Sequence, residues 1–174
     1  REGKLTIDTT QVFCKYKKGA GFIFIDVPGH RQLLKNALCG SAYADIAILV
    51  VDIQKSIEEG SRAHVNILKF LGIKNIIAVL NKMDGAGFSE DMFKSVKLQA
   101  LDFFKSCGLA CEYIIPIAAS QGDNLIKRSK NMAWYKGPAL IAALNKLKKY
   151  LEKENTPCDF YFAVQDKYSI DGEE

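Results

Sequence analysis

Three short stretches of the sequence combine residue types that could bind a nucleotide. The first, Asp26-Val27-Pro28-Gly29, directly follows an apolar run. A carboxylate at the end of a strand can hold Mg²⁺ through a bound water molecule, and a glycine there lets a backbone N–H approach a phosphate oxygen closely. The same residues would also make an ordinary turn. Taken alone, the stretch leaves both interpretations open.

The second stretch, Asn81-Lys82-Met83-Asp84, follows the apolar run 75–80. Asp84 could accept hydrogen bonds from N1–H and the 2-amino group of guanine, which adenine does not offer. Asn81 could donate to N7 of the base, and the stem of Lys82 could lie over the ring. A polar loop between a strand and a helix would have the same composition, so that alternative also stays open.

The third stretch, from Pro116 to Asn124, places two small residues, Ala118 and Ala119, after another apolar run. Small side chains would let the backbone N–H groups of both reach an oxygen of a base. A loop of small residues without a ligand would look the same. Two loops at the ends of successive strands, one suited to magnesium phosphate and one to guanine, are harder to explain as turns. The combination therefore favours a guanine nucleotide site.

The elements that must position these stretches alternate between strands and helices. Residues 6–17 and 22–26 indicate a hairpin. Continuous apolar runs, typical of parallel strands buried on both faces, predict strands over 46–52, 75–81 and 112–117. Helical spacing of apolar residues predicts helices over 30–44 and 58–71. A third helix is predicted to begin at Ser89, with Phe93, Val96, Ala100 and Phe104 on one face, and a fourth to run from Gly137-Pro138 to about 153. The pattern predicts a three-layer α/β domain with a mainly parallel sheet and ligands at the carboxyl ends of its strands.

The composition agrees with one globular unit. The chain has 174 residues, of which 48% are hydrophobic, and its net charge of +4 is too small to indicate nucleic-acid binding by itself. The five cysteines and the lack of a secretory signal pattern predict reduced thiols in a cytoplasmic protein. Cys107 and Cys111 have no second Cys/His pair at ligand spacing, so packed thiols are favoured over zinc. No apolar run is long enough to cross a membrane.

In this order the motifs resemble those of the GTP-binding domain of translation-factor-type GTPases, over residues 1–172. "LTIDTTQ" is similar to the end of the first switch region and "DVPGH" to the second. "NKMD" is similar to the guanine-specificity loop and "AAS" to the last base-contacting loop. The resemblance implies a P-loop GTPase-like fold that binds GTP and Mg²⁺.

The resemblance also implies a role for each matching residue. Asp26 would hold the magnesium water, the N–H of Gly29 would contact the γ-phosphate, and His30 would position the attacking water. Thr6 would coordinate Mg²⁺ through its hydroxyl and help to order the switch. The guanine base would be held by Asn81, Lys82, Asp84, Ala118 and Ala119. Ala118 departs from the family's serine, although a backbone contact from Ala119 could survive that change.

Two branches of the family share the segments "GDN" and "NMAWYKGPALIAAL". "TIDTTQ" and Asp52 in "LVVDIQKS" favour the large, GTPase subunit of bacterial sulfate adenylyltransferase, because elongation factors usually read I-D-V-A-H and V-V-A-A there. GTP hydrolysis would then be coupled to sulfate activation in a small catalytic subunit, without nucleic acid or membrane. Elongation factor 1 alpha, which delivers aminoacyl-tRNA, is the alternative. A nucleotide-free interaction domain that has kept the fold is a third.

The phosphate loop itself is the largest departure from the family. No G-x-x-x-x-G-K-S/T occurs in the sequence, and the pair Gly3-Lys4 is followed by leucine. We therefore expect the first strand and the phosphate loop to precede Arg1. In the family that strand lies between the strands that end at Asp26 and Asp52. Residues 1–154 are then an N-terminally truncated GTP-binding domain, and 155–174 are a linker and the first strand of a following β-barrel domain.

Overall fold

A computed structural model describes residues 9–15, 21–27, 44–55 and 59–154. The helix expected over 30–44 lies almost entirely outside these ranges. The linker and barrel strand expected over 155–174 lie outside them completely.

Three parallel strands form the main sheet in the order β3-β4-β5. They are β3 (Ala47–Asp52), β4 (Ile76–Asn81) and β5 (Tyr113–Pro116). The central strand β4 is buried from its first residue to Leu80, as its apolar run predicts for a strand with a neighbour on each edge. In the parallel register Asp52 lies opposite Asn81. The carboxyl ends of the strands therefore meet at one edge of the sheet.

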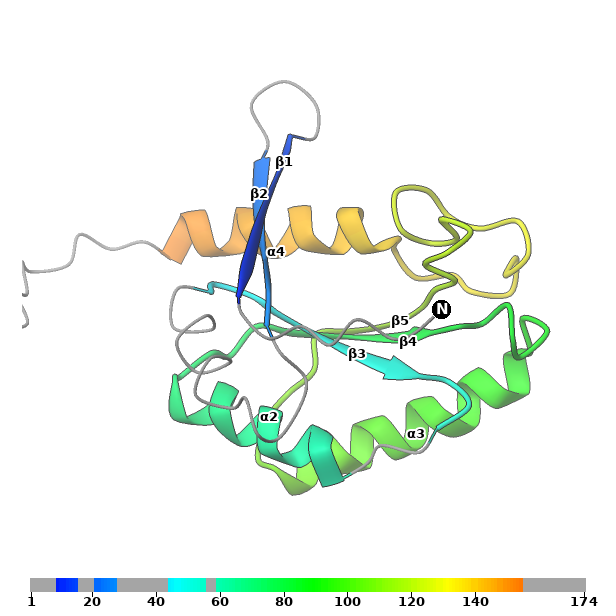
Figure 1. Ribbon diagram of the computed structural model, residues 1–174, viewed down its shortest axis with the longest axis horizontal. Coiled ribbons are helices and arrows are strands. Elements are labelled where there is room, and N and C mark those ends of the chain that lie inside the picture. The colour runs from blue at the N-terminus through cyan, green and yellow to red at the C-terminus, as the bar shows by residue number, and fades with distance from the viewer. Residues whose placement is uncertain (1–8, 16–20, 28–43, 56–58, 155–174) are drawn as a thin grey trace, which may run out of the picture.

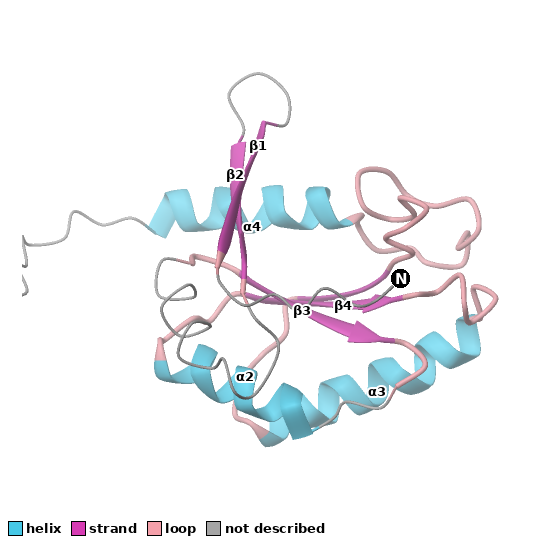
Figure 2. Cartoon of the chain, viewed as in Figure 1, coloured by secondary structure: helices cyan, strands magenta, loops and turns pink. Residues whose placement is uncertain are grey.

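Helices cover both faces of this sheet, which gives the predicted three layers (Figure 1). α2 (Glu59–Phe70) and α3 (Glu90–Ser106) lie on one face, and α4 (Leu140–Glu154) lies on the other. Figure 2 shows the strands as a layer between the helices, with the long loops gathered at the end to which β3 points. The prediction of an α/β domain with a mainly parallel sheet is confirmed.

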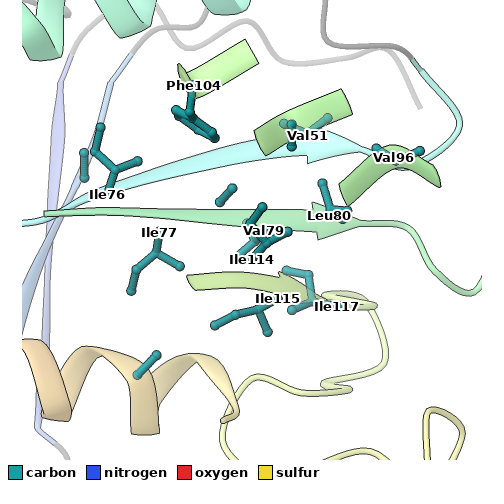
Figure 3. Packing of buried hydrophobic residues seen from close by; sticks show 14 of the residues in the cluster. Val51, Ile76, Ile77, Val79, Leu80, Val96, Phe104, Ile114, Ile115 and Ile117 are labelled. Atoms are coloured by element: carbon teal, nitrogen blue, oxygen red, sulfur yellow. The ribbon is translucent and has the colours of Figure 1, made fainter. Parts of the chain in front are cut away.

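The core is divided by the sheet, since successive side chains of a strand point to opposite faces. In Figure 3, Ile76 and Leu80 of β4 lie on the side of Phe104, which belongs to α3. Ile77 lies on the side of α4, together with Ile115 of β5. All five side chains are at most 1% exposed. A strand buried on both faces gives the loop after it a rigid support.

α3 begins where its sequence predicted. The Oγ atom of Ser89 accepts the backbone N–H of Met92 at 3.2 Å, and two acidic residues follow in the first turn, where they complement the helix dipole. The predicted apolar face is buried; its members are Phe93, Val96, Ala100 and Phe104. Ser89 thus fixes the point at which the loop after β4 ends.

β1 (Thr10–Lys15) and β2 (Gly21–Asp26) form the predicted antiparallel hairpin, with Thr10 opposite Asp26. Phe22 and Phe24 of β2 pack against the core cluster, while Ile23 between them is 57% exposed. Within the described residues the hairpin is a sheet separate from β3-β4-β5. Its last residue, Asp26, ends the second strand as the sequence indicated.

One expectation for β3 is wrong. The apolar run predicted a strand buried on both faces, yet Val50 is 62% exposed. Val50 lies opposite Val79 in the register, and Val79 shares with Ile77 the face of β4 that α4 covers (Figure 3). Its exposure means that this cover does not extend over β3, which is an edge strand among the described residues. The apolar run correctly predicted a parallel strand, but it did not predict that one face of this strand would be left partly uncovered.

Candidate nucleotide-binding site

The loop after β4, residues 82–88, is wound around Met83. The side chain of Met83 is fully buried, and its N–H donates to the carbonyl of Ile117 at 3.1 Å. Its carbonyl accepts the N–H groups of Ala86 and Phe88 at 3.2 and 2.8 Å. Met83 therefore anchors the loop to Ile117, the residue that follows β5. This anchoring role was not predicted from the sequence, where the only signal for it is an apolar side chain between Lys82 and Asp84.

Asn81 joins this loop to the third stretch. Its Oδ1 atom accepts the backbone N–H of Lys82 at 2.8 Å and the backbone N–H of Ala119 at 3.1 Å. Its Nδ2 atom has no acceptor among the described residues. The side chain is thus fixed by two hydrogen bonds to its oxygen, and its amide hydrogens remain available. This leaves Asn81 able to donate to a ring nitrogen such as N7 of a purine.

Asp84 carries a carboxylate oxygen that lacks a donor. Its Oδ2 accepts the hydroxyl of Ser120 at 3.5 Å, while Oδ1 is shielded from solvent and has no hydrogen-bond donor within the described part of the chain. A buried acceptor without a partner costs roughly 1 to 3 kcal/mol. The two adjacent N–H groups of a guanine edge are a donor set that would satisfy it. The residues present therefore fit a guanine base at Asp84.

Lys82 is held by an acid on the neighbouring strand. Its Nζ lies 2.7 Å from Oδ2 of Asp52, the last residue of β3. The hydrogen bond from Lys82 is the main cause that holds the pKa of Asp52 below its ordinary value. Lys82 has a φ of 65°, which a non-glycine residue adopts only when its surroundings impose it. Asp52 was not predicted as a site residue; in the sequence it only distinguished two branches of the family.

The two alanines of the third stretch are placed beside Asn81. Ala118 is buried and Ala119 is exposed. The backbone N–H groups of both alanines, predicted to contact a base oxygen, already have acceptors within the protein. The N–H of Ala118 donates to the backbone carbonyl of Asp123 at 3.4 Å, and that of Ala119 donates to Oδ1 of Asn81. A base oxygen at Ala119 would therefore share its hydrogen with Asn81. Ser120, which the sequence analysis did not single out, contributes the hydroxyl that faces Asp84.

The long loop between β5 and α4 is organised by Asn124. This buried residue donates from Nδ2 to the carbonyl of Pro116 at 2.9 Å, and its Oδ1 accepts the N–H of Ser129 at 2.7 Å. Farther along the same loop, the indole N–H of Trp134 donates to the carbonyl of Phe88 at 3.1 Å. The loop that carries the alanines is thus tied to both ends of the loop that carries Asp84.

The phosphate side of the predicted site is described only at Asp26, an exposed residue at the end of β2. Thr6, Gly29 and His30 lie outside the described residues. Within the described ranges no group of three or more His, Cys, Asp or Glu side chains gathers around a possible metal position. Mg²⁺ commonly takes one or two protein ligands and completes its shell with phosphate and water. Asp26 is a suitable ligand type, and its assignment to Mg²⁺ stays a prediction.

The cysteines of the described residues are free thiols. Cys107 is buried, and the Sγ of Cys111 donates to the carbonyl of Tyr113 at 3.2 Å. Burial raises the pKa of the Cys111 thiol to about 11.

Among the described helices, none is long and apolar enough to cross a membrane.

Comparison with known families and curated sequences gives a consistent result. The family model for the elongation factor Tu GTP binding domain matches residues 1–165. Elongation factor 1-alpha of Thermococcus gammatolerans is 37% identical over 173 residues, which cover 99% of this chain and 40% of the relative. Sulfate adenylyltransferase subunit 1 of Aliarcobacter butzleri is 37% identical over 166 residues, covering 95% and 35%. The chain spans about 40% of the length of the curated relatives it matches.

Solved structures agree with the fold. A bacterial selenocysteine-specific elongation factor matches with a TM-score of 0.68 and 28% identity, over 87% of this chain and 23% of that one. The elongation factor SelB of Methanococcus maripaludis, in complex with a GTP analogue, matches with a TM-score of 0.60 and 21% identity over 92% and 31%. At the latter identity the likeness concerns the fold alone.

Proposed function

Because the chain belongs to the elongation factor Tu GTP binding domain family, we propose that it binds GTP and Mg²⁺ and supplies most of the nucleotide site of a GTPase. The observation that carries this proposal is the arrangement of Asn81 and Asp84. Asn81 is fixed through its oxygen with its amide hydrogens available, and Asp84 has a buried oxygen without a donor among the described residues.

Discrimination between bases follows from this arrangement. Guanine brings N1–H and a 2-amino group to Asp84, whereas adenine has neither donor at the corresponding edge. An adenine in the site would leave Oδ1 of Asp84 buried and unsatisfied, at a cost of roughly 1 to 3 kcal/mol, or about 5- to 150-fold in affinity. Asn81 would donate to N7, which both purines share. Asp84 is therefore the residue that selects guanine.

The phosphate side is proposed from the resemblance. Mg²⁺, held by Thr6 and Asp26, would neutralise charge on the phosphates. The N–H of Gly29 would bind a γ-phosphate oxygen, and His30 would orient the water that attacks the phosphorus. Positioning and electrostatic stabilisation account for most of the catalysis in phosphoryl transfer. His30 therefore acts on the rate of hydrolysis more than on nucleotide affinity.

Within the family we favour the GTPase subunit of sulfate adenylyltransferase, which would couple GTP hydrolysis to the formation of adenylyl sulfate in a partner subunit. The sequence segments "TIDTTQ" and "LVVDIQKS" support this choice, and Asp52 of the second segment makes an ion pair with Lys82. Elongation factor 1-alpha relatives of equal identity support the alternative, a factor that delivers aminoacyl-tRNA.

The first experiment measures nucleotide binding. The protein used is the natural gene product that contains residues 1–174, because these residues include no phosphate-loop motif. Isothermal titration calorimetry with GTP, ITP and ATP, each with Mg²⁺, should give the tightest binding for GTP. ITP, which lacks the 2-amino group, should bind more weakly, and ATP weakest of the three. Equal affinity for GTP and ATP would refute the assignment of Asp84, and binding of neither would favour a nucleotide-free interaction domain.

A second experiment separates the two branches. The gene product is mixed with a sulfate adenylyltransferase small subunit, and adenylyl sulfate formed from ATP and sulfate is measured with GTP and with a non-hydrolysable GTP analogue. Stimulation by GTP alone supports the sulfate role. GTP-dependent binding of aminoacyl-tRNA, without stimulation, would support the elongation factor instead.

A further inference from the structure

The turn after β3 lies against the loop that carries Asp84. Asp52 makes an ion pair with Lys82 at 2.7 Å, and the side-chain amide of Gln54 donates to the carbonyl of Gly85 at 2.7 Å. Between them, the backbone N–H of Ile53 donates to the carbonyl of Asn81 at 2.9 Å. Three successive residues at and directly after the end of β3 therefore contact the last residue of β4 and the loop that follows it.

Asp52 is well placed to hold a lysine. Its Oδ1 accepts the backbone N–H of Gln54 at 3.1 Å, which fixes the carboxylate and leaves Oδ2 for Lys82. The side chain of Asp52 is 17% exposed, whereas that of Lys82 is 61% exposed. A lysine so exposed would otherwise sample many rotamers in water, and ordering it on binding a base would cost conformational entropy. The ion pair removes part of that cost before a nucleotide arrives.

Gln54 acts on the residue next to Asp84. A Cβ atom added to Gly85 would lie 3.0 Å from Nε2 of Gln54, which is closer than most real Cβ contacts. Glycine at this position therefore permits the approach of Gln54 to the backbone. Because Gly85 directly follows Asp84, the hydrogen bond from Gln54 restricts the backbone that presents the Asp84 carboxylate.

We propose that Asp52 and Gln54 are positioning residues for guanine recognition, Asp52 through Lys82 and Gln54 through Gly85 and Asp84. The inference rests on the proposed function, since it concerns the same base site. It also gives a physical role to the residue that separated the two branches. An alanine in place of Asp52, as elongation factors usually have, cannot pair with the lysine, so the two branches would hold Lys82 differently.

The test uses the natural gene product with Mg²⁺ and compares Kd values for GTP and ITP in four proteins: wild type, Asp52→Ala, Gln54→Ala and the control Asp102→Ala. Asp102 is an exposed aspartate on α3. We expect Asp52→Ala to weaken the binding of GTP and ITP alike by about two- to fivefold, the range for an ion pair in which one partner is exposed. The effect should shrink at high salt. Gln54→Ala should lower the Kd for ITP divided by the Kd for GTP, because Asp84, which accepts from the 2-amino group, would be less well fixed. Asp102→Ala should change neither.

A double-mutant cycle tests the route through Lys82. Lys82→Met keeps an apolar stem without the ammonium, so adding Asp52→Ala to it should weaken GTP no further. Equal weakening by Asp52→Ala in both backgrounds would overturn the role assigned to that residue. Unchanged Kd values in both single variants, with guanine-specific binding by the wild type, would overturn the inference and leave the proposed function intact. Absence of guanine-specific binding by the wild type would overturn both.

Discussion

The side-chain oxygen of Asn81 accepts the backbone N–H of Ala119 at 3.1 Å, although the two residues are 38 positions apart in the sequence. The same oxygen accepts the N–H of Lys82. One amide side chain thus joins the two loops that the sequence assigned to a guanine base. Asn81 therefore has two proposed roles: its oxygen holds the two loops together, and its amide hydrogens are available to a base.

Substitution of Asn81 by two different residues should separate these roles. Asn81→Asp keeps an acceptor for both backbone N–H groups but cannot donate to N7, so the free energy of unfolding should stay near that of wild type while GTP binding weakens about tenfold. Asn81→Ala removes the acceptor as well and should also lower the free energy of unfolding by about 1 to 3 kcal/mol. Urea denaturation and calorimetry measure the two quantities. Wild-type GTP affinity in Asn81→Asp would contradict the proposed contact with N7.

Asp84→Asn should change the preferred base. Asparagine offers an amide hydrogen where Asp84 offers an acceptor, so it matches xanthine, which has a carbonyl in place of the 2-amino group of guanine. GTP should bind more weakly and xanthosine triphosphate more tightly than in wild type. Competition against a fluorescent nucleotide measures both. If the variant and the wild type bound GTP equally, Asp84 would not contact the base.

His30→Ala should slow hydrolysis without loss of GTP binding. A positioned catalytic group contributes on the order of 100-fold or more, and His30 is expected to act on the attacking water. Single-turnover hydrolysis of bound GTP reports the rate, and calorimetry reports the affinity. Unchanged turnover would contradict the role proposed for His30 in positioning the attacking water.

Ser89→Ala should destabilise the domain by about 1 kcal/mol, the usual cost of removing an N-cap side chain. The Ser89 hydroxyl accepts the N–H of Met92, which loses this acceptor in the variant. Ser95→Ala is the matched control, because Ser95 is exposed within α3 and alanine is favourable in a helix. Urea denaturation should show the loss in the first variant alone. Equal stability of the two would argue against the cap.

Alkylation of Cys111 should depend on pH up to unusually alkaline values. Its folded pKa is raised to about 11 by burial, so the reactive thiolate is scarce at pH 8. The rate of modification by iodoacetamide should rise about tenfold per pH unit between about pH 8 and 10, whereas an ordinary thiol levels off above its pKa near 8.5. Peptide mass spectrometry isolates Cys111, and unfolding in urea should restore the ordinary profile. A plateau near pH 9 in the folded protein would contradict the raised pKa.

The bounds of single helices and strands could be predicted from the sequence, whereas the exposure of their side chains could not always be. The apolar run 75–81 predicted β4 almost to the residue, and Ser89 with its acidic followers predicted the start of α3. These features depend on backbone geometry over a few residues, which local sequence specifies. The same reasoning failed for Val50, since its exposure depends on which elements cover β3.

For the candidate site, the residue types that follow the strands could be read from the sequence, including Asn81, Lys82 and Asp84. Their partners depend on the assembled fold: Lys82 pairs with Asp52, Asn81 accepts the N–H of Ala119, Ser120 faces Asp84, and Gln54 contacts Gly85. These partners lie far apart in the chain and meet because β3, β4 and β5 are parallel and in one particular register. A shift of one residue in a strand would turn its side chains to the opposite face, so such contacts follow from the assembled sheet rather than from any short stretch of sequence.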